Sequence, residues 1–453
     1  MTTAKNSSLR VALASFIGTT IEYYDFFIFG TAAALVFPKI FFPESTPLMG
    51  TLMAFATLGV GFIARPIGGV VFGHFGDRIG RKRMLILSLI GMGVATCLMG
   101  TLPTYAQIGI WAPVSLAILR LVQGFCVGGE WGGATLMAVE HAPPAKRGFY
   151  GSFPQMGGPA GTATATLAFL AVSTFTTDDQ LLTWGWRVPF LLSSLLVVVG
   201  LVIRFTTTES PEFERVTAKR GEVKLPVAVA LSQHWREILI VAGIYLSQGV
   251  ISYIVMSYLV SYSTTVAGID RNWALLGVFI GAIVLTALCP VFGALSDRIG
   301  RKTTYMLGAV AMCITSGPAI YLIDLGQPWA LMLAILLVYG LAMAPACAVT
   351  GSLLSLAFKT EIRYTGVSIG YTLSLIVGSA FAPMIATAIY AKTGTIYGLY
   401  VYLLIVSAIS IVSVLLLPGP FRRKEAKNQT LRYTDEKEAS NSYTNTPFDE
   451  KLA

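Results

Sequence analysis

The sequence predicts an all-α membrane protein with twelve transmembrane helices in two pseudo-symmetric six-helix bundles. Three observations predict this fold: the composition, a series of long apolar runs, and a loop that occurs twice. Hydrophobic residues make up 55% of the 453 residues and charged residues only 12%, whereas a soluble domain carries about 25% charged residues. So few charges cannot form a water-facing surface on a chain of this length, and we expect lipid to be its main solvent.

Twelve apolar runs are each long enough to cross a bilayer as a helix, which takes about 20 residues. Their edges are approximate, and they cover residues 11–37, 48–73, 84–103, 109–138, 149–175, 186–206, 236–264, 272–296, 303–324, 328–357, 364–391 and 396–417. The polar stretch 207–235 is the one long internal loop, and it separates the first six runs from the last six.

These runs predict the organisation of the chain. We expect a cytoplasmic N-terminus, an N-terminal bundle, a cytoplasmic central loop, a C-terminal bundle and a disordered cytoplasmic tail, at residues 1–10, 11–206, 207–235, 236–417 and 418–453. The tail is polar and rich in Ser, Asn, Thr and charge, so it cannot bury enough apolar surface to fold alone.

The basic residues predict the orientation in the membrane. With the N-terminus inside, nearly all Lys and Arg fall on the inner side, and the outer side keeps only Lys39, Arg187, Arg271 and Lys392. Cytoplasmic loops carry such an excess, so we expect a multi-pass protein of the cell membrane with both termini in the cytoplasm. The net charge of +9 does not indicate nucleic-acid binding, because the basic residues lie in short loops and not on one amphipathic face.

The side chains that commonly carry catalysis or metal binding form no usable pattern. The five cysteines all fall within predicted spans and lack metal-ligand spacing, so they are expected to be small apolar core residues. The three histidines, His74, His141 and His234, lie at predicted helix ends, and no Ser-His-Asp arrangement accompanies them. We therefore expect no enzyme activity, no metal and no cofactor.

A ten-residue loop occurs once in each half. It begins at Gly73 and again at Gly293, an offset of 293 − 73 = 220 residues, and both copies follow the pattern Gly-x-x-x-Asp-Arg-x-Gly-Arg-Lys between two apolar runs. Internal repeats of this size are typical of secondary transporters. We expect gating or structural roles for Gly73, Asp77, Arg78, Gly80 and Arg81 in the first copy and for Gly293, Asp297, Arg298, Gly300 and Arg301 in the second.

Two carboxylates lie in the middle of the first predicted span. Glu22 and Asp25 are spaced i, i+3, so they share one helix face. A carboxylate at the bilayer midplane costs several kcal/mol unless it is paired, hydrated or protonated. We expect at least one of them to take and release a proton, and the alternative is a static ion pair that holds helices together.

Three further charges lie inside predicted spans, at Arg65, Arg120 and Glu130. Arg65 and Glu130 lie closer to the cytoplasm on different helices and are expected to form a gate or a structural pair. Arg120 lies near mid-membrane, and its planar guanidinium matches a carboxylate. Arg120 therefore has two possible roles, as a ligand of a substrate carboxylate or as the permanent counter-ion of Asp25.

The second half carries no charge inside its predicted spans away from their ends, but it offers polar side chains. Tyr245 and Gln248 are i, i+3 neighbours on the seventh span, and Tyr371 lies on the eleventh. Together with Tyr23 on the first span, they are the expected substrate-binding residues beside Arg120.

The motifs resemble those of a known superfamily. The repeated loop and the segment Arg120-Leu121-Val122-Gln123-Gly124 resemble signatures of the major facilitator superfamily. The resemblance narrows to its metabolite:proton symporter family over the segments 21–26, 64–69, 123–125, 128–133, 184–190 and 209–213. Within that family the first half is similar to the shikimate-type carriers, above all over residues 54–84.

This resemblance implies proton-driven uptake of a small organic carboxylate by alternating access. The substrate would be shikimate or a related hydroaromatic, aromatic or dicarboxylic acid, and the chain would function as a monomer in the lipid bilayer. Three alternatives stay open: a proline/betaine-type zwitterion symporter, a drug or metabolite efflux antiporter favoured by Gly158-Pro159, and a non-transporting nutrient sensor.

Overall fold

The computed structural model describes residues 2–79, 81–128, 142–206, 231–358 and 363–417. Contacts join residues 1–414 into one compact unit. All twelve predicted spans are helical in their described parts, and no β-strand occurs among the described residues. The central loop at 207–230, the tail at 418–453 and Glu130 lie outside the described residues, and the division into bundles 11–206 and 236–417 stays a prediction.

The helices of the first half follow the predicted runs closely. They are α1 (Thr2–Leu35), α3 (Pro47–Ile79), α4 (Arg81–Thr101), α6 (Trp111–Val127), α8 (Arg147–Phe175) and α10 (Arg187–Thr206), with the short helices α2 (Phe37–Ile40), α5 (Tyr105–Ile108) and α9 (Asp178–Gln180) in the connections and a π turn, η2 (Leu181–Gly185), before α10.

In the second half, three spans contain a π-helical turn. The continuous helices are α15 (Arg271–Ile299), α16 (Arg301–Asp324) and α21 (Tyr397–Leu416). The interrupted spans are α13 (Trp235–Tyr253), η3 (Ile254–Tyr258) and α14 (Leu259–Thr265); α17 (Pro328–Ile335), η4 (Leu336–Ala342) and α18 (Ala344–Leu354); and α19 (Arg363–Ser374), η5 (Leu375–Ser379) and α20 (Ala382–Thr393). Single π turns inside helices are frequent at functional sites.

Length and apolarity agree with a membrane environment. Among the described residues, seven helices are long and apolar enough to cross a bilayer, or eight if the bent pair Asp178–Gly185 and Arg187–Val202 forms one span. Large apolar side chains such as Ile63, Leu195 and Leu415 are exposed, as expected for side chains that face lipid.

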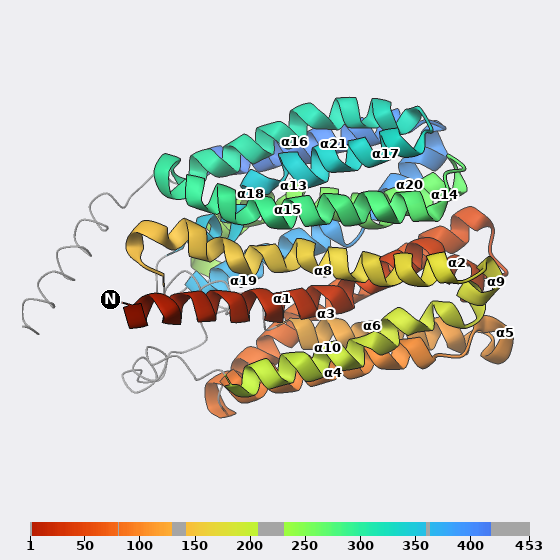
Figure 1. Ribbon diagram of the computed structural model, residues 1–453, viewed down its shortest axis with the longest axis horizontal. Helices are drawn as coiled ribbons and strands as arrows, with labels where there is room; N and C mark the ends of the chain where they lie inside the picture. The colour runs from red at the N-terminus through yellow and green to blue at the C-terminus, as the bar shows by residue number, and fades with distance from the viewer. Residues whose placement is uncertain (1, 80, 129–141, 207–230, 359–362, 418–453) are drawn as a thin grey trace, which may run out of the picture. The chain divides into compact units, whose positions relative to one another are not determined.

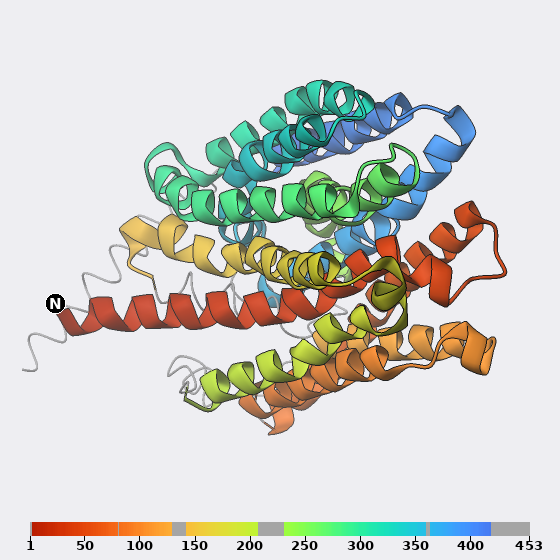
Figure 2. The ribbon, with the colours of Figure 1, turned by 45° about the vertical axis from the view of Figure 1, so that its right-hand side comes forward.

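Helix α8 lies between α1 and α15, as two views of the ribbon show (Figures 1 and 2). Glycines allow these close crossings. A Cβ atom on Gly161 would lie 2.8 Å from the backbone nitrogen of Tyr24, and a Cβ on Gly148 would lie 2.6 Å from the carbonyl oxygen of Gly293. A Cβ on Gly293, the first glycine of the second repeat, would in turn lie 2.9 Å from the carbonyl oxygen of Gly148, so packing against α8 requires a glycine at this position.

The α8–α15 pair is tied at both ends. At one end, the Asp297 carboxylate accepts hydrogen bonds from the backbone nitrogens of Gly148 (2.7 Å) and Phe149 (3.0 Å), at the N-terminus of α8. A carboxylate is favourable there because it satisfies unpaired N–H groups and the helix dipole. At the other end of the pair, Arg271 forms an ion pair with Asp178. This guanidinium holds the pKa of the Asp178 carboxyl, which lies beyond the predicted spans, below its ordinary value.

The two repeat loops are described to different extents. Gly300 has φ +91°, a conformation that favours glycine, and it separates α15 from α16. Arg298 is exposed in the last turn of α15, and Arg301 begins α16. In the first copy, Gly73, Asp77, Arg78 and Arg81 are helical but their side chains are not described, and Gly80 lies outside the described residues.

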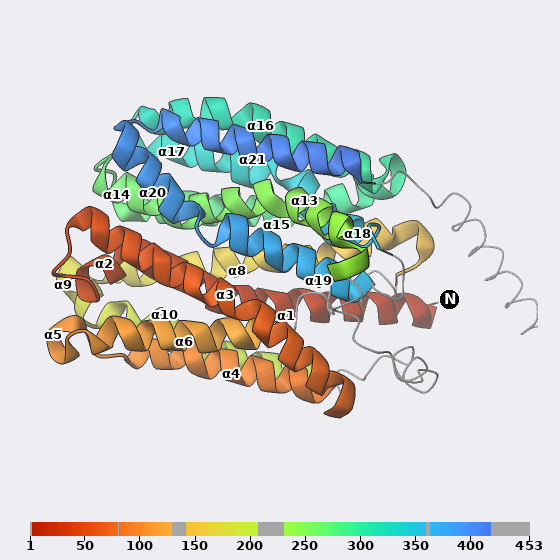
Figure 3. The ribbon, with the colours of Figure 1, turned by 180° about the vertical axis from the view of Figure 1, so that it is seen from behind.

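Helices α3 and α6 touch through their backbones. A Cβ on Gly124 would lie 1.9 Å from the carbonyl oxygen of Gly61, and a Cβ on Gly128 would lie 2.1 Å from that of Arg65. Helix α3 also packs against α19 and α20 of the second half (Figure 3). These contacts place Arg65 between α6 and the second half.

We predict that Gly124→Ala lowers the stability of the protein in detergent by about 1–3 kcal/mol, because the added methyl group forces α3 and α6 apart. The midpoint of thermal unfolding measures this change. Gly18→Ala is the matched control, since Gly18 lies in α1 with nothing within 4 Å of an added Cβ. Equal unfolding midpoints for the two variants would contradict the close backbone contact.

Candidate functional site

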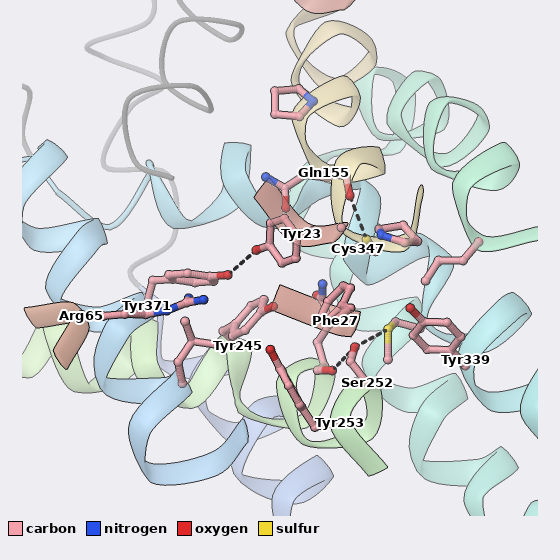
Figure 4. Close-up of a pocket in the computed structure, with 17 residues that line it drawn as sticks. Tyr23, Phe27, Arg65, Gln155, Tyr245, Ser252, Tyr253, Tyr339, Cys347 and Tyr371 are labelled. Atoms are coloured by element: carbon pink, nitrogen blue, oxygen red, sulfur yellow. Dashed lines mark hydrogen bonds between the residues drawn. The ribbon is translucent and has the colours of Figure 1, made fainter. Parts of the chain in front are cut away.

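A cavity lies between helices of the first half and helices of the second (Figure 4). Helices α1, α3 and α8 of the first half line it, together with α13, α15, η4, α18, α19 and η5 of the second half. Its polar lining consists of Tyr23, Arg65, Gln155, Tyr245, Gln248, Ser252, Tyr253, Tyr339 and Tyr371.

Arg65 is the charged side chain among the described residues that line this cavity. It is 8% exposed, and its Cζ atom lies 4.2 Å from the centre of the Phe26 ring and 4.8 Å from that of Phe62. Its Nε atom has no hydrogen-bond partner among the described residues. Aromatic faces stabilise the cation, and its planar fork is suited to bind a carboxylate.

Tyrosine side chains surround Arg65. The hydroxyl groups of Tyr23 and Tyr371 share a hydrogen bond of 2.7 Å, which joins α1 to α19, and the Tyr245 and Tyr371 rings lie 4.6 Å apart. Figure 4 shows Arg65 beside Tyr371, with Tyr245 and Tyr253 close by. This part of the cavity combines one cation with aromatic faces and hydroxyl groups.

The rest of the cavity offers amides, hydroxyls and a thiol. Gln248 accepts a hydrogen bond of 2.8 Å from Thr350, and Ser252 donates to the Gln248 carbonyl. Cys347 donates weakly to the carbonyl of Gln155 on α8, at 3.8 Å. These groups can hydrogen-bond a polar ligand that the cation holds at one end.

Asp25 lies outside the cavity lining, although Tyr23 on the same helix lines it. The Asp25 side chain is fully buried and accepts a hydrogen bond from Ser193 on α10, and its Oδ2 atom has no partner among the described residues. Glu22, one turn earlier, is also buried. A buried carboxylate with one oxygen unpartnered is suited to carry a proton.

A hydrogen-bonded network links Asp25 to Arg120. The Gln123 amide donates to the carbonyl oxygen of Asp25 (3.0 Å) and to the Thr96 hydroxyl (2.7 Å), and Arg120 donates to Gln123. Among the described contacts, Arg120 forms no ion pair with Asp25, and its Nε and Nη2 atoms have no partner. In place of a direct contact between Arg120 and the Asp25 carboxylate, the Gln123 side-chain amide links Arg120 to the main chain of Asp25.

The structure places Arg120 away from the cavity, which differs from the expectation that it meets the substrate there. Its stem passes over Gly61 of α3, where an added Cβ would lie 2.8 Å from the Arg120 Nε. Its guanidinium lies over the rings of Phe26 and Phe29, with Cζ 3.8 and 4.2 Å from their centres. Arg120 therefore faces the interior of the first half.

The four other expected substrate residues, Tyr23, Tyr245, Gln248 and Tyr371, all line the cavity. Arg65 was expected to form a gate or a structural pair with Glu130. It lines the same cavity, and because Glu130 lies outside the described residues their pairing stays a prediction. The sequence reasoning did not select Gln155, a cavity residue whose signal is a lone amide in an apolar span.

Comparisons with known proteins agree with this architecture. The sequence profile of the Major Facilitator Superfamily matches residues 15–298 and 285–448. The solved structure of the proton:xylose symporter XylE bound to 6-bromo-6-deoxy-D-glucose aligns with a TM-score of 0.70 at 18% identity, covering 91% of this chain and 96% of that one. At 18% identity, this structural similarity shows a shared fold and nothing about the substrate.

Curated relatives match over nearly the whole chain. The inner membrane metabolite transport protein YhjE of Escherichia coli (strain K12) is 42% identical over 419 residues, which cover 91% of this chain and 94% of YhjE. The shikimate transporter of the same organism is 40% identical over 412 residues (90% and 94%), and its proline/betaine transporter is 30% identical over 442 residues (95% and 87%). The chain thus belongs to the major facilitator superfamily, as a multi-pass membrane protein that transports metabolites and is not an enzyme.

Proposed function

We propose that the protein is a proton-coupled symporter of a small organic carboxylate, in particular a ring-shaped hydroxy acid of the shikimate type. The observation that carries this proposal is the cavity in which Arg65 lies among tyrosines of both halves. The 40% identity to a shikimate transporter supports the substrate class, and the fold shared with a proton:xylose symporter is compatible with proton coupling.

The cavity chemistry suits such an acid at three points. The Arg65 guanidinium can hold the carboxylate through two parallel hydrogen bonds. The rings of Tyr245 and Tyr371 can lie against the flat face of a substrate ring. Gln155 and Gln248 can hydrogen-bond the ring hydroxyls, as the few polar groups of an otherwise apolar site usually do.

Asp25 is the proposed proton site, with Glu22 as the second candidate. When protonated, Asp25 keeps its bond to Ser193. When ionised, it attracts Arg120, which is separated from it by the Gln123 amide. A carboxylate that changes partner with its protonation state gives the protein two states with different contacts, which coupled transport requires.

The repeat loops are proposed to control access from the cytoplasm. Asp297 caps α8 across the boundary between the halves, so its release would accompany opening of the inner side. By the repeat, Asp77 would have the corresponding role in the first half. We also propose the inner-membrane location with both termini cytoplasmic, supported by the basic inner loops, and function as a monomer.

A zwitterion such as proline or betaine is the second candidate substrate. The rings of Tyr23, Phe27, Tyr245 and Tyr253 line the cavity beside Arg65, and aromatic faces bind quaternary ammonium groups. The 30% identity to a proline/betaine transporter points the same way. An exchange assay in which carboxylic acids and zwitterions compete with the same labelled substrate decides between the two classes, since the class that the protein transports competes more strongly.

We predict that Arg65→Gln raises the KM for the carboxylate by about 10- to 150-fold, because a hydrogen bond to a charged group contributes roughly 1.5–3 kcal/mol. Arg65→Lys should restore part of the loss, since it keeps the charge without the fork. Exchange of labelled shikimate in proteoliposomes, with no proton gradient, measures KM. Lys392→Gln, at an exposed position in the last turn of α20, is the control. An unchanged KM in Arg65→Gln would contradict the proposed carboxylate site.

We predict that Asp25→Asn abolishes accumulation driven by a proton gradient and leaves exchange of internal for external substrate in place, because a neutral amide cannot release a proton. Uptake into tight vesicles with and without an imposed gradient measures both activities. Asp179→Asn, at an exposed position in α9, should retain both. Gradient-driven accumulation by Asp25→Asn would assign proton coupling to another group.

A further inference from the structure

Phe26 is the residue whose ring contacts both buried arginines. The ring is 1% exposed, and its centre lies 3.8 Å from Cζ of Arg120 and 4.2 Å from Cζ of Arg65. It also makes edge contacts with Phe62 (4.8 Å) and with Tyr253 of α13 (6.5 Å). One aromatic ring therefore stands between a cation that lines the cavity and a cation that does not.

The same residue follows the proposed proton site in the chain. Gln123 holds the carbonyl oxygen of Asp25 and accepts from Arg120, so the peptide that carries Phe26 is fixed to the Arg120 network. Among the described contacts, Asp25 itself bonds Ser193 on α10 and does not reach the cavity. A substrate bound at Arg65 therefore needs an intermediate contact to influence Asp25.

The physical basis of such an influence is the attraction of both cations to one ring. A cation over an aromatic face is held more strongly when water is excluded, as it is here. Two like charges on one ring also repel each other. A substrate carboxylate at Arg65 neutralises one of the two positive charges and so removes its repulsion of Arg120. The relative strength of the two attractions on Arg120, to the Phe26 ring and to the Asp25 carboxylate, then changes.

We propose that Phe26 is a positioning residue that couples substrate binding at Arg65 to the position of Arg120 and the protonation of Asp25. This inference rests on the proposed function. The groups that face Asp25 are Tyr24 on its own helix, Thr96 and Cys97 on α4, and Ser193 on α10, and Glu22 lies one turn earlier on α1. The titratable groups that face the Phe26 ring are Arg65, Arg120 and Tyr253.

The test replaces Phe26 with mono-, di- and trifluorinated phenylalanine, which weaken the attraction to cations with little change in shape. With each added fluorine, we expect a stepwise fall in the accumulation ratio of labelled shikimate at a fixed proton gradient, reaching about tenfold. The pH dependence of KM should flatten in parallel, while exchange without a gradient persists. Exchange also shows that each variant is folded and binds substrate.

Two neighbouring phenylalanines give matched controls. Phe62 contacts Arg65 and Phe29 contacts Arg120, and neither ring lies over both guanidinium groups. Fluorination at either position should change KM or stability without reducing the accumulation ratio. If fluorinated Phe26 cannot be incorporated, Phe26→Leu and Phe26→Tyr replace the series, with Phe26→Tyr expected to retain coupling.

The outcomes separate this inference from the function on which it rests. If the unmodified protein accumulates the acid and the trifluorinated Phe26 variant accumulates it equally, the inference is wrong and the proposed function stands. An equal loss of accumulation at Phe29 or Phe62 would also overturn it, because the effect would then be general packing. Failure of the unmodified protein to accumulate any carboxylic acid under a gradient would reject the proposed function and the inference together.

Discussion

Two arginines that share one phenylalanine ring inside the membrane-spanning helices are the interaction on which the rest of this structure depends. A charge at this depth costs several kcal/mol unless the protein compensates it. Here the compensation comes from the ring of Phe26, which contacts both guanidinium groups, with Phe62 as a second ring at Arg65 and Phe29 as a second ring at Arg120. The arrangement keeps one cation at the cavity and the other beside the Asp25 network, so the proposed binding site and the proposed proton site are separate but adjacent.

Close helix packing makes this arrangement possible. Gly61 leaves room for the Arg120 stem, and the contact between Gly124 and Gly61 brings α3 and α6 together, so that both arginines reach Phe26. Glycine also allows α8 to lie against α1 and α15, where Asp297 and Arg271 tie the two ends of the α8–α15 pair. The two halves are therefore joined around the cavity by glycine contacts, by the Asp297 and Arg271 contacts, and by aromatic contacts such as those of Phe26 and Phe62 with Tyr253.

The sequence predicted the helices of the fold because the length and apolarity of each run, and the recurrence of the repeat, can be read directly from the residues without knowledge of tertiary contacts. All twelve runs are helical in their described parts. The repeat was expected to be a loop, but most of each copy is helical: the first spans the end of α3 and the start of α4, and the second the end of α15 and the start of α16. Four of the five expected substrate residues line the cavity, since polar residues in apolar spans tend to face an interior. Which of the two arginines lines the cavity could not be predicted from the sequence, because it depends on the rotation of α3 and α6 about their axes, which the contacts at Gly61 and Gly124 determine.

The central claim is that a carboxylate and a proton enter together, and proton movement tests it most directly. Proteoliposomes that contain a pH-sensitive dye would be given external shikimate, with equal pH on both sides and the membrane potential clamped to zero. The account predicts acidification of the interior that follows substrate entry and is absent in Asp25→Asn. Entry of labelled shikimate without any change in internal pH would contradict it and indicate uncoupled transport or another coupling ion.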